Sequence, residues 1–258
     1  MSSHKRPRVL FYDIETSLMP VAVFQLAHND WIDPSSILEE RYIICASWMW
    51  EGETEIHSVS TLDNPRRYKK NPHDDTHVVE MLHKVLSEAD VLIGHNSDSF
   101  DKRYIDTRIL IHGLSPLPPI NSIDTYKVAK SKLLLASNKL DYIGKLLGVG
   151  KKMHTSHNLW LRVLQGDPEA VKEMVIYNKQ DVVLLRKVFL KLRPYCANHI
   201  NRELFGDIGC PRCGSQDVQS RGTHKAITRS YQRWQCQDCG GWFRTLKAEN
   251  ASTKYRVL

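Results

Sequence analysis

Two acidic residues, Asp13 and Glu15, lie within the largely apolar run RVLFYDIET (residues 8–16). Charged groups are costly to bury unless something pairs with them. Residues two apart on a strand point to the same face, so we expect the two carboxylates to lie side by side. A helix cap or a salt bridge at a sheet edge would explain an isolated pair equally well, so the pair alone does not indicate a site.

Two later segments carry further polar groups. GHNSDSFD (94–101) follows an apolar strand and ends at Asp101, which begins a helix. Polar loops at the carboxyl ends of strands are where α/β proteins place their sites. In YNKQD (177–181), Tyr177 and Asp181 lie four residues apart and therefore on one helix face. Taken singly, capping explains Asp101, and a surface contact explains the Tyr177–Asp181 pair.

Together these segments resemble the DnaQ-like (DEDD) 3′–5′ exonucleases, which have a ribonuclease H-like fold. The likeness spans residues 8–193. The histidine subclass would have His where this chain has Ile176, so the chain resembles the tyrosine subclass, DEDDy. The three family motifs occur in the family's order, as Asp13-Ile14-Glu15, His95-Asn96 with Phe100-Asp101, and Tyr177 through Asp181.

The residues around the third motif indicate which members of this family the chain resembles most. KLDYIGKLLGVGKK (139–152) and the segment 160–189 are similar to the proofreading domain of family B DNA polymerases and to stand-alone nucleases of that kind. The opening DIETS, with its long insertion, is most similar to phage-borne members. No polymerase region is visible in this sequence, so we expect any proofreading to act in trans.

The resemblance implies metal-dependent hydrolysis of phosphodiester bonds, with two Mg²⁺ or Mn²⁺ ions on carboxylate oxygens. Asp13 would bridge both ions, and Asp101 would hold the ion on the leaving-group side. Glu15 and Asp181 would hold the ion that activates water, and Tyr177 would orient that water. Without metal, such carboxylates repel one another and their pKa values rise. We therefore expect metal ions, rather than a basic side chain, to balance them.

The resemblance also implies substrate contacts. Thr16 and the residues just after it, including Leu18, would line the pocket for the 3′-terminal nucleotide, although Leu18 could equally belong to the core. Asn96 would contact the substrate backbone. Asp124 recurs in proteins of this kind, but helix capping explains it equally well.

The expected function is a 3′–5′ exonuclease on single-stranded nucleic acid, with DNA favoured and RNA possible. A structure-specific endonuclease or an RNA-processing nuclease on the same fold stays open. A non-catalytic binding module is disfavoured, because all four acids and the tyrosine are present.

Two CxxC pairs, CPRCG (210–214) and CQDCGG (236–241), are separated by 22 residues. Four thiolates within tetrahedral reach make a closed structural Zn²⁺ site, and the pattern resembles a zinc ribbon. A disulfide framework would instead require an oxidising compartment. We therefore expect one structural Zn²⁺, with four ligands: Cys210, Cys213, Cys236 and Cys239.

The positive charge is concentrated in this C-terminal part. The formal net charge of the chain is +7, and residues 210–258 carry nine Lys or Arg against three acids, which gives +6. Basic residues interleaved with aromatic ones suit single-stranded nucleic acid. A ribbon that docks replication or repair proteins stays open as an alternative.

Apolar strands and amphipathic helices predict an α/β fold, a ribonuclease H-like mixed sheet flanked by helices, with a small four-cysteine zinc ribbon at the C-terminal end. The predicted domains are 1–205, the exonuclease domain, and 206–258, the ribbon and basic tail. No apolar run long enough for a membrane and no secretory signal is visible, so we expect no membrane partner and a cytoplasmic location, or the host cytoplasm for a phage protein. Expected strands are 8–16, 41–50, 54–61, 91–96 and 117–125, the expected polar loop is 63–75, and expected helices are 74–90, 99–113, 124–135, 139–148, 167–180 and 181–192.

Overall fold

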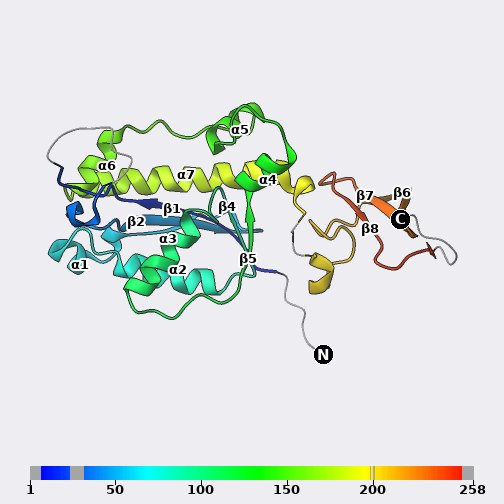
Figure 1. The fold of residues 1–258 in the computed structure, drawn as a ribbon, viewed down its shortest axis with the longest axis horizontal. Coiled ribbons are helices and arrows are strands. Elements are labelled where there is room, and N and C mark those ends of the chain that lie inside the picture. The colour runs from blue at the N-terminus through cyan, green and yellow to red at the C-terminus, as the bar shows by residue number, and fades with distance from the viewer. Residues whose placement is uncertain (1–6, 24–31, 198, 200, 252–258) are drawn as a thin grey trace.

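The computed structural model describes residues 7–23, 32–197, 199 and 201–251. A five-stranded mixed sheet with the strand order β3-β2-β1-β4-β5 forms its centre (Figure 1). The central strand β1 runs antiparallel to β2 and parallel to β4. The predicted α/β class is confirmed. The strands are β1 (Val9–Thr16), β2 (Ile43–Trp50), β3 (His57–Ser60), β4 (Val91–Gly94) and β5 (Asn121–Asp124).

Helices cover both faces of the sheet, which is why β1 and β4 are apolar almost throughout. Figure 1 shows helix α7 (Pro168–Leu192) along one face and helices α2 (Thr76–Ser87) and α3 (Asp101–Ile111) along the other. Phe11 of β1 packs edge-on against Phe189 of α7, with ring centroids 5.4 Å apart. Because side chains alternate along a strand, Asp13 and Glu15 share the face of Phe11 and lie under α7.

Helix α7 is a single helix of 25 residues, whereas the sequence suggested two segments. It begins at a strong signal: the Asp167 side chain accepts the Glu169 N–H at 2.9 Å, and Pro168 occupies the first helical position. At 1.5 Å per residue the helix is about 37 Å long. Three shorter helices precede it: α4 (Thr125–Lys132), α5 (Leu140–Leu146) and α6 (His157–Leu164).

The segment 63–75, predicted as a polar loop, contains the short helix α1 (Pro65–Lys70). The polar composition of this segment suggested a loop, but the residues at the start of α1 are those of a helix N-terminus. The Asn64 side chain accepts the Arg67 N–H at 3.2 Å, and Pro65 fills the first helical position.

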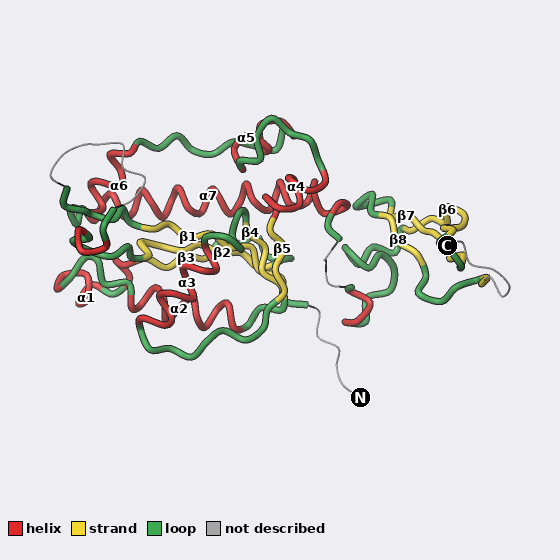
Figure 2. Tube along the Cα trace, viewed as in Figure 1, coloured by secondary structure: helices red, strands yellow, loops and turns green. Residues whose placement is uncertain are grey.

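The C-terminal module forms a second, antiparallel sheet beyond the C-terminal end of α7 (Figure 2). Arg202 forms ion pairs with Glu51 (2.6 Å) and with Asp207 (2.8 Å) on either side of the predicted division, and Arg212 of the module donates a hydrogen bond to the Pro194 carbonyl (2.6 Å). Among the residues that the structure describes, no helix is both long and apolar enough to cross a membrane. The strands of the module are β6 (Val218–Lys225), β7 (Arg229–Cys236), β8 (Trp242–Arg244) and β9 (Asn250–Ala251).

Candidate active site

Three of the predicted carboxylates converge between β1 and α7. Asp13, Glu15 and Asp181 each offer one carboxylate oxygen, and these oxygens all lie within 4.8 Å of one another. Asp181 is 1% exposed, because the middle of α7 lies directly over β1. The structure thus joins two residues near the N-terminus to one that lies more than 160 positions later.

The fourth acid, Asp101, lies next to this group without being part of it. It is the first residue of α3, it is 5% exposed, and its Oδ1 accepts the Ile14 N–H at 3.3 Å. Its charge acts on Asp13 and raises the pKa of that residue. Ile14 and Asp13 are neighbours on β1, so the backbone of β1 holds the second motif against the first.

Asn178 is a residue of the site that was missed from the sequence. Asn178 of α7 donates a hydrogen bond from Nδ2 to Asp13 Oδ2 at 2.7 Å and is fully buried. It lies next to Tyr177 and three residues before Asp181, so its position in the third motif was the available signal.

The carboxylates are strongly perturbed, as expected for a like-charged cluster. Burial and the neighbouring charge of Asp101 raise the pKa of Asp13 well above its usual range. Burial, followed by Asp181, raises the pKa of Glu15 to about 8. Burial raises the pKa of Asp101 to about 6, although the Ile14 N–H opposes the rise. Each carboxylate makes it harder for the others to ionise.

The expectation that no basic side chain balances these acids is wrong. Lys152, in the loop between α5 and α6, places Nζ 2.5 Å from Asp181 Oδ2 and 3.2 Å from the Tyr177 hydroxyl. Burial alone would lower the pKa of Lys152, but Asp181 and Asp13 raise it above its ordinary value. The Lys152 N–H donates to Asp141 of α5 at 2.9 Å, which anchors the loop. Lys151 and Lys152 look alike in the sequence, so only the folded loop distinguishes them.

One oxygen in the cluster has no partner. Asp181 Oδ1 is fully buried and forms no hydrogen bond with any residue that the structure describes, while Oδ2 faces Lys152. An unpartnered buried carboxylate oxygen is costly. Its position beside Asp13 and Glu15 fits a divalent cation, because hard cations prefer several carboxylate oxygens.

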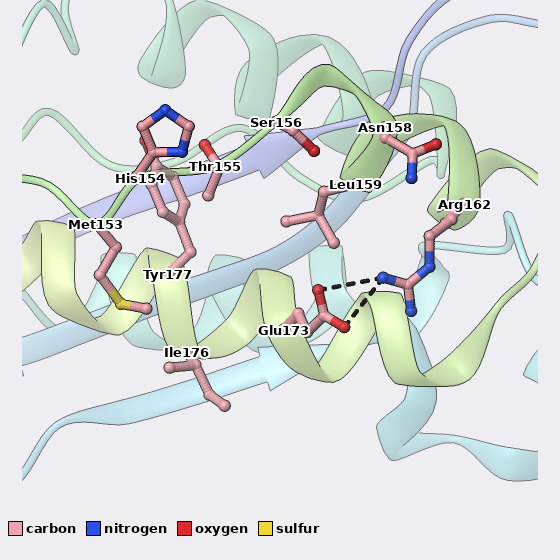
Figure 3. A pocket seen from close by; sticks show the side chains of 10 residues that line it. All are labelled: Met153, His154, Thr155, Ser156, Asn158, Leu159, Arg162, Glu173, Ile176 and Tyr177. Carbon is pink, nitrogen blue, oxygen red and sulfur yellow. Dashed lines mark hydrogen bonds and ion pairs between the residues drawn. The ribbon is translucent and has the colours of Figure 1, made fainter.

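Tyr177 borders a cavity of about 340 Å³ between α7, α6 and the loop 153–156 (Figure 3). Its side chain is largely buried, and burial, followed by Asp181, raises its pKa to about 12. The phenol is therefore protonated at neutral pH. At the far side of this cavity Arg162 forms an ion pair with Glu173, at 3.0 Å.

The second-motif loop is held by Asp124, which confirms its capping role. The Asp124 side chain accepts the N–H of Tyr126 at the start of α4 and also the N–H of Asn96, at 2.9 and 2.8 Å. Asn96 has a φ of +63°, which non-glycine residues seldom adopt. A second cavity, of about 390 Å³, lies beside this loop and is lined in part by Asn96, Lys139 and Lys152.

The predicted nucleotide-pocket residues lie where β1 ends. Thr16 is its last residue, and the register with β2 shifts between Glu15 and Thr16. Leu18 is half-buried, and Ser17 donates its N–H to the Tyr42 carbonyl at 3.0 Å. Part of the long insertion that follows, residues 24–31, lies outside the described residues.

The four predicted zinc ligands also converge. The Sγ atoms of Cys210 and Cys239 are 3.7 Å apart, and those of Cys213 and Cys236 are 3.6 Å apart. Four Zn–S bonds of about 2.3 Å in a tetrahedron place sulfur atoms about 3.8 Å apart. All four cysteines are free, and their spacing far exceeds a disulfide bond, so the donors fit Zn²⁺.

A mixed α/β sheet with acidic residues on its central strand defines the class of ribonuclease H-like proteins. The family model of the RNase H superfamily matches residues 43–193, more than half of the chain, and the chain belongs to this superfamily. The match includes the second and third motifs and begins after β1.

The comparison with solved structures agrees at the level of the fold. The family B DNA polymerase from the hyperthermophilic archaeon Pyrobaculum calidifontis superposes with a TM-score of 0.54 and 18% identity, over 80% of this chain. The chain spans about a quarter of that polymerase (26%). No curated protein matches the chain in sequence.

Proposed function

We propose that the chain is a metal-dependent 3′–5′ exonuclease for single-stranded nucleic acid, with DNA as the favoured substrate. The observation that carries the proposal is the convergence of Asp13, Glu15 and Asp181, whose Oδ1 has no partner among the described residues, next to Tyr177. Membership of the RNase H superfamily and the fold shared with a DNA polymerase support it. The preference for DNA rests on that second likeness.

The carboxylates would hold two Mg²⁺ or Mn²⁺ ions, with Asp13 shared, Glu15 and Asp181 on one ion and Asp101 on the other. When bound, such ions neutralise charge on the attacking and leaving oxygens of a phosphodiester. Asn178 fixes the rotamer of Asp13 through its 2.7 Å hydrogen bond and so keeps the shared carboxylate in place.

Two further side chains act on the reacting groups. With a pKa of about 12, Tyr177 is a poor general base, so it orients the attacking water through its hydroxyl. The positively charged Nζ of Lys152 lies next to the Tyr177 hydroxyl and would stabilise negative charge that develops on the phosphate. Asn96, beside the second cavity, would contact the substrate backbone, and Thr16 and Leu18 would border the terminal nucleotide.

The C-terminal module would hold one structural Zn²⁺ on its four cysteines and form a unit separate from the exonuclease domain. We place the division at residues 205 and 206. A small sheet of this size buries little apolar surface, so the metal would supply most of its folding free energy.

The experiment follows single-stranded DNA labelled at either end, with Mg²⁺ or Mn²⁺ added. An exonuclease of this polarity releases labelled mononucleotide at once from 3′-labelled DNA and gives a ladder from 5′-labelled DNA. Asp181→Asn should abolish both, and Asp106→Asn, on the exposed side of α3, is the matched control. Internal cuts in circular single-stranded DNA would instead support an endonuclease, and full activity of Asp181→Asn would refute the proposal.

A further inference from the structure

One face of the C-terminal sheet carries arginines and aromatic rings in alternation. In the register of β7 and β8, Arg233 lies opposite Arg244 and Gln235 lies opposite Trp242. Directly paired residues share a face, and so do residues two apart on one strand. Tyr231, Arg233, Trp242 and Arg244 therefore share one face, which we call the arginine face.

The rings order the guanidinium groups. The Arg244 guanidinium carbon lies 3.6 Å from the ring centroid of Tyr231, and that of Arg233 lies 5.0 Å from that of Trp242. A guanidinium stacked on a ring directs its N–H groups outward in its own plane, where they can still donate to a phosphate. Trp242 is itself 47% exposed, so it offers a ring surface to a base.

The charge of this face is not neutralised locally. Among the described residues, no carboxylate forms an ion pair with Arg221, Arg233 or Arg244. Residues 210–258 carry +6, and a Zn²⁺ on four thiolates would reduce this only to +4. Arg233 donates from Nε and Nη2 to the Arg221 carbonyl, at 3.0 and 2.8 Å, which orders its guanidinium without neutralising its charge. Ordered arginines without a carboxylate partner, next to an exposed indole, suit phosphates and stacked bases.

We propose that the arginine face binds single-stranded nucleic acid upstream of the end that occupies the acidic site. The location supports this order. The module joins the body at Pro194, beyond the C-terminal end of α7, while Asp181 lies in the middle of that helix. The 11 residues from Asp181 to Leu192 span about 16 Å, and the arginine face lies beyond that end (Figure 1), so the two sites are separated by at least about five stacked nucleotides at 3.4 Å each.

The proposal that one strand spans both sites rests on the proposed exonuclease function, but binding at the arginine face does not. The binding test therefore uses full-length protein with Asp13→Asn to prevent hydrolysis, and fluorescein-labelled oligo(dT) of about 20 nucleotides. Arg233→Gln with Arg244→Gln should weaken binding at least tenfold. It should also reduce the slope of log K against log salt by about 1.4, for two lost phosphate contacts.

The control removes the same charge elsewhere: Arg66→Gln with Arg103→Gln changes two exposed arginines of the body and should alter the affinity less than twofold. Zinc content reports whether the module stays folded. Arg229 lies two residues before Tyr231 on β7 and therefore points to the same face. Arg221→Gln with Arg229→Gln leaves the stacked pairs intact, so this second variant should weaken binding several-fold even if the first one loses zinc. Unchanged affinity and salt slope in the zinc-loaded variants would overturn the proposal and indicate a protein-docking surface.

Hydrolysis separates the two proposals. On oligo(dT) of about four nucleotides, which is too short to reach the module, Arg233→Gln with Arg244→Gln should cleave like the wild type; on long oligo(dT), kcat/KM should fall at least fivefold. A wild type that binds through the arginine face yet hydrolyses nothing would refute the exonuclease and leave the binding surface standing. Equal losses on short and long substrates would refute the upstream placement.

Discussion

Lys152 Nζ lies 2.5 Å from Asp181 Oδ2, so a lysine from a loop neutralises one of the carboxylates that would hold metal. Asp181 is 1% exposed, whereas the Lys152 side chain is 32% exposed. The lysine therefore approaches a buried acid from the solvent side. It offsets the repulsion within the acidic cluster when no cation is bound.

Lys152→Met should destabilise the protein when Mg²⁺ is absent, because the buried Asp181 loses its positively charged partner. We expect a loss of about 1–3 kcal/mol, less than for a fully buried pair since the lysine is partly solvated. Added Mg²⁺ or Mn²⁺ should recover most of this loss, since the cation takes over the neutralising role. Urea unfolding with and without the added ion measures both effects.

Lys145→Met is the control for that experiment. Lys145 also lies 2.5 Å from an aspartate, Asp141, but it is 57% exposed and should cost at most about 0.5 kcal/mol. Equal metal-dependent recovery in both variants would show that the Lys152 pair has no special relation to the cation.

Tyr177→Phe should lower kcat by about 10²-fold with little change in KM, because one positioned hydroxyl is lost. The fold should lose no more than about 1 kcal/mol, since the hydroxyl accepts its hydrogen bond from Lys152, which is itself 32% exposed. Single-turnover hydrolysis of 3′-labelled DNA measures the rate. Tyr195→Phe, at an exposed position, should leave it unchanged; a Tyr177→Phe variant as fast as wild type would remove the hydroxyl from the mechanism.

Asp75→Ala should destabilise the body by about 3–5 kcal/mol. Asp75 is fully buried and accepts the Ile43 N–H at 2.9 Å, together with hydrogen bonds from Arg108 and His112. Removal of Asp75 leaves the guanidinium of Arg108, which is 11% exposed, without a carboxylate partner. It also leaves the Ile43 N–H, at the start of β2, without its acceptor. Urea unfolding checks this, and Asp106→Ala, which breaks an exposed pair on α3, should cost about 0.5 kcal/mol or less. Similar losses of unfolding free energy in the two variants would contradict a stabilising role for the buried hydrogen bonds of Asp75.

Cys239→Ser should release the zinc that we expect in the C-terminal module. Zinc freed by a mercurial reagent and measured with a colorimetric chelator should amount to one ion per chain in the wild type and far less in the variant. The far-UV circular dichroism of the helical body should persist, because its core contains none of the four ligands. Cys196→Ala, outside the cluster, should keep its zinc; a wild type without zinc would refute the site.

The sequence correctly predicted the features that depend on residues close to one another in the chain. Alternation on β1 placed Asp13 and Glu15 on one face, and the spacing of Tyr177 and Asp181 placed them on one side of a helix. The CxxC pairs were equally informative, because their spacing predicted four thiols within tetrahedral reach and the four sulfur atoms lie together in the fold. These features depend on the few residues around them.

The missed features depend on tertiary structure. Lys152 reaches Asp181 only because the loop after α5 folds back over α7, and no spacing rule connects the two. Helix α1 was obscured by polarity, although Asn64 and Pro65 signal its start. Helix α7 continues without a break across residue 180 because it packs against the sheet along its length. This packing cannot be predicted from the neighbouring residues in the sequence.

The position of α7 in the chain has a consequence for synthesis. β1 is made long before α7, and Asn178 and Asp13 meet across 165 positions. On the ribosome, a growing chain can form the hairpin of β1 and β2 long before α7 emerges, but it cannot complete the acidic cluster. The proposed metal site therefore forms only after α7 has been synthesised, and a chain that ends before α7 would lack it.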